Sequence, residues 1–300
     1  MPKNKKEITN VQKSELEKKQ LSKLKILDGM TAYIISLALF ALAYVWGTDR
    51  VGVWALYIAA VLSIGAVIVL TKITGLKFSS VFSFTAPKKS EIVGCALALA
   101  AAFMLSMPLV LFSHLIAPNL AVTSFNIYSV VDEKGGTFVV ILLVILLAVL
   151  ENLLFDGYIY SRFKGIKNPL VRALTLSLMA SLIRLDIYAL TTVFVMSVAA
   201  FAVRKAGGSL SLALVVRLFE VSFVMAMTNV SATASQLLGN SMGAVQVTGL
   251  SVIFLGIAIP AAAGASAVFG KLKNNGKIIG FLSGVLSIVF IAMGCGISSL

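Results

Sequence analysis

Charged residues are scarce in this sequence. Asp, Glu, Lys and Arg make up 12% of its 300 residues, about half the share found in soluble globular domains. This scarcity excludes an ordinary soluble domain. A hydrophobic content of 59% and a mean hydropathy of +1.00 exclude a disordered chain, because disordered chains are poor in apolar residues. The composition therefore predicts an integral membrane protein that crosses the bilayer several times.

Cysteine and histidine are scarcer still. Both cysteines, Cys95 and Cys295, lie inside apolar runs, which excludes a disulfide framework and a cysteine zinc site, and we expect them to pack as small apolar residues. The one histidine, His114, ends an apolar run, and we expect it at the membrane interface. Because hydrolytic metal sites use about three protein ligands, usually including imidazole, we expect no metal and no other cofactor.

Nine apolar segments approach the length of about 20 residues that spans a bilayer. They cover 30–47, 51–71, 91–117, 137–160, 170–186, 188–203, 209–228, 244–264 and 278–297. The sequence thus predicts an all-α, polytopic membrane helix bundle over 28–300, preceded by a basic tail over 1–27. The fifth and sixth segments are short and adjoining; if 170–203 holds a single span, the total is eight.

Lysines and arginines lie almost entirely on one side of these segments. Arg50 and Lys134 are the only two in the loops of the other side, Arg184 and Arg217 fall within apolar segments, and the remaining 21 of the 25 are in the tail and alternate loops. Because positively charged loops stay in the cytoplasm, we predict a multi-pass protein of the cell membrane with its N-terminus cytoplasmic and its C-terminus outside. Orientation and contact with the anionic cytoplasmic leaflet then explain the net charge of +13, and nucleic acid is not needed as a partner.

Six charged residues cannot be placed in loops. An ionisable group at bilayer depth costs at least about 2.5–3.5 kcal/mol on insertion scales, so it normally faces the bundle interior and has a partner. All six fall between residues 150 and 221, and this clustering indicates one shared polar region. They are Glu151, Asp156, Arg184, Asp186, Arg217 and Glu220.

The spacing of these charges predicts part of their geometry. Arg217 and Glu220 are three residues apart, so on a helix they share a face and can pair. Asp156 is five residues from Glu151 and on an α-helix points elsewhere. Two interpretations stay open: an ion network that locks helices together, or a polar functional site in the middle of the bilayer.

Two short motifs carry a family resemblance. Residues 151–157, Glu-Asn-Leu-Leu-Phe-Asp-Gly, resemble the motif Glu-Glu-x-x-Phe-Arg-Gly of the CPBP family, whose membrane proteins include CAAX prenyl endopeptidases and bacteriocin-immunity proteins. Residues 204–210, Arg-Lys-Ala-Gly-Gly-Ser-Leu, resemble the basic turn and Gly-Ser-Leu that open the family's third motif. The resemblance covers about 85–230 and implies a CPBP-like core there.

The resemblance implies a metal-assisted endopeptidase site with two glutamates, an arginine and two histidines, and this sequence departs from most of it. Glu151, Phe155 and Gly157 match the first motif, so Glu151 is the one candidate catalytic residue. The other positions differ: Asn152 stands at the second glutamate, Asp156 at the arginine, Asp186 nearest the first histidine, Arg217 at the second histidine and Val221 at its paired asparagine, with Glu220 beside them.

Three functions are compatible with these residues. The first is a non-catalytic CPBP-like protein that binds a membrane protein or peptide, as an immunity or secretion-accessory protein. The second is an active CPBP-type intramembrane metalloprotease that cleaves peptides or prenylated proteins with zinc or another divalent metal; the carboxylates are suitable ligands for a hard cation, but the nearby arginines favour salt bridges. The third is an ion- or proton-coupled transporter whose buried acids relay the ion.

Overall fold

The computed structural model describes residues 25–52, 54–116, 127–184, 187–207, 209–238, 243–270 and 276–299. These residues form helices joined by turns and short loops, and within these ranges there is no strand, which confirms the predicted all-α bundle. The N-terminal helix covers Lys25–Gly47 and ends in a π-helix, η1 (Ala43–Gly47). The elements after it are α2 (Thr48–Val51), α3 (Trp54–Ile73), α4 (Phe78–Val81), α5 (Lys89–Ile116), α7 (Ile127–Glu151), η2 (Asn152–Ile159), α8 (Tyr160–Arg162), η3 (Phe163–Gly165), α9 (Pro169–Leu182), α10 (Ile187–Gly207), α11 (Leu210–Leu238), α12 (Ala244–Val268) and α13 (Gly276–Ser298). Residues 1–24 of the predicted tail lie outside the described residues.

Each predicted apolar segment coincides with a described helix, but the helices differ in length. Seven helices in the described part of the chain are long and apolar enough to cross a membrane: the N-terminal helix, α3, α5, the rod from α7 to η3, α10, α12 and α13. The fifth predicted segment, 170–186, is different, because α9 has only 14 residues. At 1.5 Å per residue it is about 21 Å long, shorter than a hydrocarbon core of about 30 Å. As a helix, α9 alone is therefore shorter than the hydrocarbon core, and the turn that contains Arg184 continues this segment toward α10. The seventh segment is α11, which has 29 residues.

The start of α9 follows from its sequence. Oδ1 of Asn168 accepts hydrogen bonds from the backbone N of Leu170 at 2.9 Å and of Val171 at 3.4 Å, and Pro169 occupies the first helical position. An N-cap asparagine followed by proline is a strong helix-start signal. The helix ends at Leu182, which leaves Arg184 in the turn that follows.

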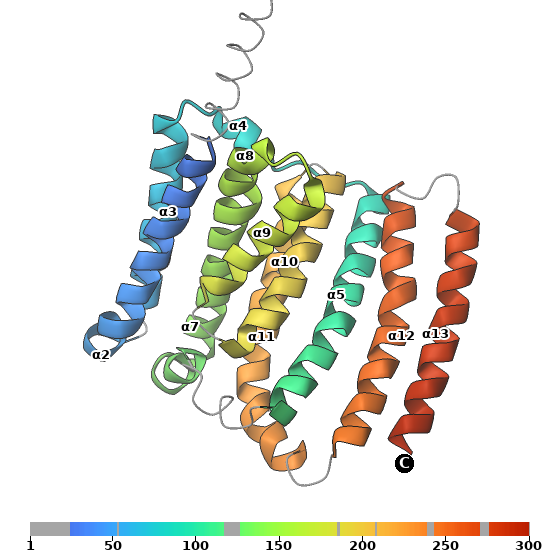
Figure 1. Ribbon diagram of the computed structural model, residues 1–300. Helices are drawn as coiled ribbons and strands as arrows, with labels where there is room; N and C mark the ends of the chain where they lie inside the picture. Colours follow the sequence, from blue (N-terminus) through green and yellow to red (C-terminus); the bar gives the residue numbers. More distant parts are fainter. Residues whose placement is uncertain are drawn as a thin grey trace, which may run out of the picture.

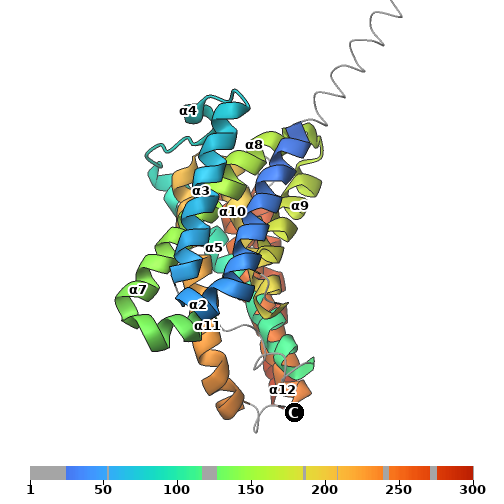
Figure 2. The same cartoon turned by 90° about the vertical axis from the view of Figure 1, so that its left-hand side faces the viewer.

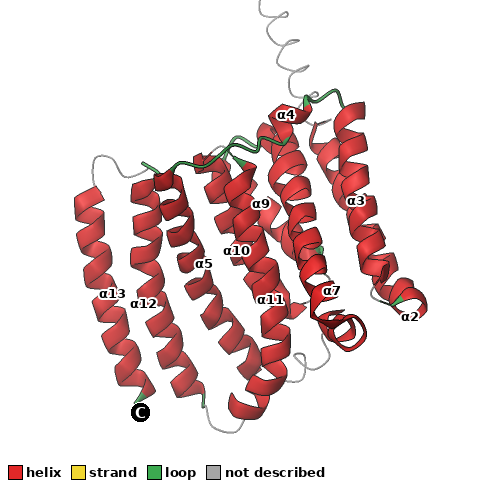
Figure 3. Cartoon of the chain, turned by 180° about the vertical axis from the view of Figure 1, so that it is seen from behind, coloured by secondary structure: helices red, strands yellow, loops and turns green. Residues whose placement is uncertain are grey.

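The helices stand in a broad row. In Figure 1 the row runs from α3 at one edge through α7, then α10 and α11, then α5 and α12, to α13 at the other edge, and Figure 3 shows the same order from behind. Neighbours in this row pack against each other directly. The N-terminal helix and α3 lie together at the first edge, as Figure 2 shows from the side. The largest buried cluster is centred on α7, η2 and the helices around them.

The two ends of the bundle differ. α4 and α8 lie at one end, which we call the basic end because loops 74–88 and 163–168, with the adjoining helix termini, carry lysines and arginines; α2 lies at the opposite end (Figure 1). The described chain begins at the basic end and finishes at the other (Figures 1 and 2). That arrangement is compatible with termini on opposite faces of a membrane, while the cytoplasmic location of the basic end stays a prediction.

Candidate functional site: a buried ion-pair cluster

The rod of α7, η2 and α8 carries two of the predicted acids. Glu151 is the last residue of α7 and Asp156 lies in η2, where the backbone N of Tyr160 donates to the carbonyl of Phe155. Such i to i+5 bonding brings residues five apart toward the same side. Both carboxylates accordingly reach Arg217: Oδ2 of Asp156 lies 2.9 Å from Nε, and Oε2 of Glu151 lies 3.8 Å from Nη1. The expectation that Asp156 points away from Glu151 assumed an α-helix and is wrong.

Arg217 on α11 is completely buried and is held by side chains from three helical elements. Its Nε and Nη2 donate to the two oxygens of Asp156 at 2.9 and 3.3 Å, a bidentate arrangement that is among the strongest ion pairs. Its Nη1 donates to Oε2 of Glu220 at 2.8 Å and to Oγ of Ser197 on α10 at 2.6 Å. These bonds hold the guanidinium group in one position.

A second arginine extends the cluster. Nη2 of Arg184, in the turn after α9, lies 2.6 Å from Oε1 of Glu151 and 3.7 Å from Oε1 of Glu220. We call Glu151, Asp156, Arg184, Arg217 and Glu220 the ion-pair cluster. Its three carboxylates and two guanidinium groups are at most 8% exposed. Because desolvated charges are tolerable only when they are paired, these contacts explain how the bundle accommodates them.

Aromatic rings flank the guanidinium group of Arg217. Its Cζ lies 5.9 Å from the ring centre of Phe155 and 5.4 Å from that of Phe201, within the range of a cation–π interaction. Phe201 is four residues after Ser197 on α10, so the two residues share a face of that helix. One face of α10 therefore supplies a hydrogen-bond acceptor and a ring to the same cation.

The other motif residues have structural contacts. A Cβ added to Gly157 would lie 2.9 Å from ring carbons of Phe82, the residue after α4, so the absent side chain lets that ring pack against η2. Nδ2 of Asn152 donates to the carbonyl of Leu210 at 3.2 Å and ties η2 to the first turn of α11. Nε of Arg204 donates to the carbonyl of Asp156 at 3.3 Å.

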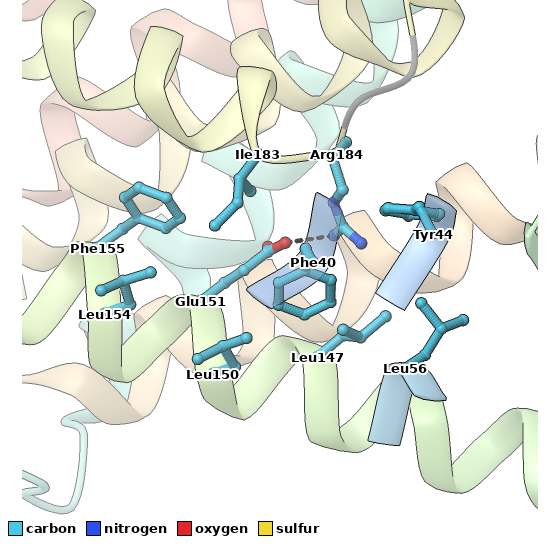
Figure 4. A pocket seen from close by; sticks show the side chains of 10 residues that line it. All are labelled: Phe40, Tyr44, Leu56, Leu147, Leu150, Glu151, Leu154, Phe155, Ile183 and Arg184. Carbon is cyan, nitrogen blue, oxygen red and sulfur yellow. Dashed lines mark ion pairs between the residues drawn. The ribbon is translucent and has the colours of Figure 1, made fainter. Parts of the chain in front are cut away.

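A small cavity opens beside the cluster. It lies between the N-terminal helix, α3, α7, η2 and the end of α9, and Figure 4 shows the Glu151–Arg184 pair within an otherwise mostly apolar lining. Its volume is about 20 Å³, enough for about one water. Phe40 and Tyr44 of the N-terminal helix are among the lining side chains. The cavity therefore has no room for a peptide or a drug-sized ligand.

Five of the six predicted membrane charges come together in the cluster, whereas the sixth, Asp186, lies outside the described residues. His114 lies in α5, and its side chain is outside the described ones. Sequence reasoning missed Ser197 and Phe201, which contact Arg217. Neither is charged, and the four-residue spacing between them has meaning only once α10 is known to face Arg217.

The donor set of the cluster does not suit a metal ion, because a guanidinium group lies between the carboxylates. Nη1 of Arg217 is 2.8 Å from Glu220 and 3.8 Å from Glu151, so a cation placed there would meet a permanent positive charge. Among the described side chains, no group of three or more His, Cys, Asp or Glu is arranged to hold a metal. The arrangement can lock the helices around it together. No family model, curated protein or solved structure matches the chain.

Proposed function

We propose that this chain is a non-catalytic membrane protein with a CPBP-like core, which acts by binding a membrane protein or peptide as a bacteriocin-immunity or secretion-accessory protein. The observation that carries the proposal is the place of Arg217, which stands where the resemblance implies a metal-binding histidine. Its guanidinium group is fully buried and hydrogen-bonded to Asp156 and Glu220. Arginine stays protonated in proteins, so it replaces a cation instead of binding one.

The contacts of Glu151 support the same proposal. A general base must be within hydrogen-bond reach of the water that it activates. Oε1 of Glu151 lies 2.6 Å from Nη2 of Arg184, and its other oxygen faces Arg217 at 3.8 Å. Catalysis by Glu151 would require these pairs to open, whereas a structural role uses them as they are. The active metalloprotease remains the alternative, and substitution of Glu151 tests it.

Ion- or proton-coupled transport is a second candidate, favoured by two buried carboxylate oxygens that accept no hydrogen bond in the described part of the chain. The cluster has three carboxylates for two guanidinium groups, and Oε2 of Glu151 and Oε1 of Glu220 accept no hydrogen bond from any described residue. A relay needs such an acceptor, since a moving proton must have a site to occupy. Proton flux into proteoliposomes under a membrane potential, lost in Glu220→Gln, would favour transport over binding.

Two isosteric variants separate the structural role from catalysis. Glu151→Gln and Glu220→Gln each remove one buried carboxylate from the cluster, and only Glu151 is a candidate catalytic base. We expect both to lower the folded amount in the membrane, because each leaves a guanidinium group with one partner fewer. The activity per folded molecule should be unchanged in both. The readout is survival of expressing cells exposed to membrane-active peptide bacteriocins, divided by the folded protein measured in detergent.

A catalytic role predicts a different pattern. Glu151→Gln would then abolish function at a normal protein level, Glu220→Gln would not, and a chelator would inactivate the unmodified protein. Purified protein carrying stoichiometric divalent metal would point the same way. Either result would overturn the proposal in favour of the metalloprotease.

A further inference from the structure

A second, larger hollow, lined by none of the cluster residues, lies toward the end of the bundle that carries α2. It runs between the N-terminal helix and α3 and has a volume of about 400 Å³, within the usual range for small-molecule sites. We call it the α2 groove. Arg50 is the only charged residue among those that line it; Leu39, Leu42, Trp46, Ile58 and Leu62 supply most of its walls.

Small residues create the groove. Ala43 and Gly47 on the N-terminal helix face Ala55 and Ala59 on α3 along its floor. A Cβ added to Gly47 would lie 2.5 Å from Cβ of Ala55, so the two backbones approach closely at this point. Small residues allow such close approach between membrane helices. The larger side chains beside them then stand above this floor as walls.

The walls face outward. Leu42, Trp46 and Ile58 are each more than half exposed, at 61%, 64% and 52%. In a chain with these membrane-spanning helices, outward apolar side chains contact lipid acyl chains. The α2 groove is therefore open to the hydrocarbon of the bilayer along its length.

The position and stacking of Arg50 indicate where the groove lies relative to the membrane surface. Tryptophan and arginine are typical of the level of the lipid headgroups, and both tryptophans of the chain, Trp46 and Trp54, lie near this end of their helices. The Cζ of the exposed Arg50 lies 5.0 Å from the ring centre of Trp46. Stacking uses the face of a guanidinium group, whereas its N–H donors lie in its plane. The edge of Arg50 can therefore still donate to a phosphate.

We propose that the α2 groove binds one anionic phospholipid, with an acyl chain along its apolar walls and the phosphate on the guanidinium edge of Arg50. Charge complementarity selects this occupant: Arg50 is the one charged residue among the described residues that line the groove, and an anionic headgroup keeps a net negative charge beside it, whereas the choline of a zwitterionic lipid offsets the charge of its phosphate. Guanidinium groups bind phosphate oxygens through parallel N–H donors. The inference does not depend on the proposed function.

The tryptophan content of the chain provides the assay. Trp54→Phe leaves Trp46, which lines the groove, as the single fluorophore, and Trp46→Phe leaves Trp54, which does not line it. Each protein is titrated, in detergent and in bilayers, with brominated phosphatidylglycerol or brominated phosphatidylcholine, whose bromines quench tryptophan on contact. The measured quantity is the ratio of the half-quenching concentrations of the two lipids.

The variants carry matched controls. Arg50→Gln removes the charge, and Arg50→Lys keeps it. Arg172→Gln removes an arginine that stacks on Tyr160 in the same way, Cζ to ring centre 4.8 Å, at the basic end. Thermal unfolding of each variant verifies that it is folded.

We expect Trp46 fluorescence to be half-quenched by the anionic lipid at about one fifth of the concentration needed for the zwitterionic lipid, the ratio typical of one basic residue at an anionic surface. The ratio should fall to about one in Arg50→Gln, persist in Arg50→Lys and Arg172→Gln, and be about one for Trp54. A ratio of one in the parent, or an unchanged ratio in folded Arg50→Gln, overturns the proposal. So does an unquenched Trp46 in a dimer, which would mean that a second copy of the chain covers the groove.

Discussion

Replacing Arg217 with methionine should strongly destabilise the bundle. The change keeps a long side chain but removes three hydrogen-bonded contacts: the bidentate pair with Asp156, the bond to Glu220 and the bond to Ser197. Removing one partner of a buried ion pair costs about 3–5 kcal/mol, because a charge is left buried without compensation. Since proteins are stable by only about 5–15 kcal/mol, we expect most of the folded population to be lost under mild denaturant.

The assay is equilibrium unfolding in detergent micelles, followed by the fluorescence of the two tryptophans. Arg172→Met is the control, because Arg172 is a half-buried arginine over a ring, and its replacement should lower the free energy of unfolding by less than about 1 kcal/mol. Adding Asp156→Asn to Arg217→Met removes one of the stranded charges, so the double variant should be less destabilised than the two single effects added together, by about 0.5–3 kcal/mol. If Arg217→Met costs no more than Arg172→Met, or if the two changes simply add, then the cluster does not hold the helices together.

Two further predictions concern η2 and the orientation in the membrane. Gly157→Ala should lower the free energy of unfolding by about 1–3 kcal/mol, because its Cβ would lie 2.9 Å from ring carbons of Phe82. Gly284→Ala is the control: a Cβ there meets nothing within 4 Å, so the free energy of unfolding should not fall in the same experiment. Pro2→Cys and Ser299→Cys, in a background without the native cysteines, should react with an impermeant thiol reagent from opposite sides of the membrane. Labelling of both from one side would mean that the predicted topology is wrong.

The helices could be predicted because the bilayer imposes a length on them. About 20 consecutive apolar residues have few alternatives to a spanning helix, so 91–117 and 244–264 correspond closely to α5 and α12. The length of α9 was less predictable. Its apolar run continues past Leu182, where the helix ends. Composition alone does not predict that Arg184, two residues later, forms an ion pair with Glu151.

The site was predictable to the extent that charge dictates it. Arg217 and Glu220 are three residues apart on one helix, and their pairing follows from helical geometry. The contact of Asp156 with the same arginine does not follow, because no residue pattern in 152–159 signals a π-helix. Ser197 was not predictable either, since it is one of several buried serines and only the position of α10 distinguishes it.

The π-helical segment η2 also affects how the rod of α7, η2 and α8 packs against two sets of neighbouring helices. An α-helix turns about 100° per residue, so the extra residue in each π turn changes the angular phase between the residues before η2 and those after it. α7 packs against α3 and α11, whereas η2 also contacts α9 and α10. The change of phase lets one continuous helical rod present differently directed faces to these partners without a loop between α7 and α8. The direction in which each side chain of this rod points thus depends on the hydrogen-bonding pattern of the backbone as well as on the order of the residues.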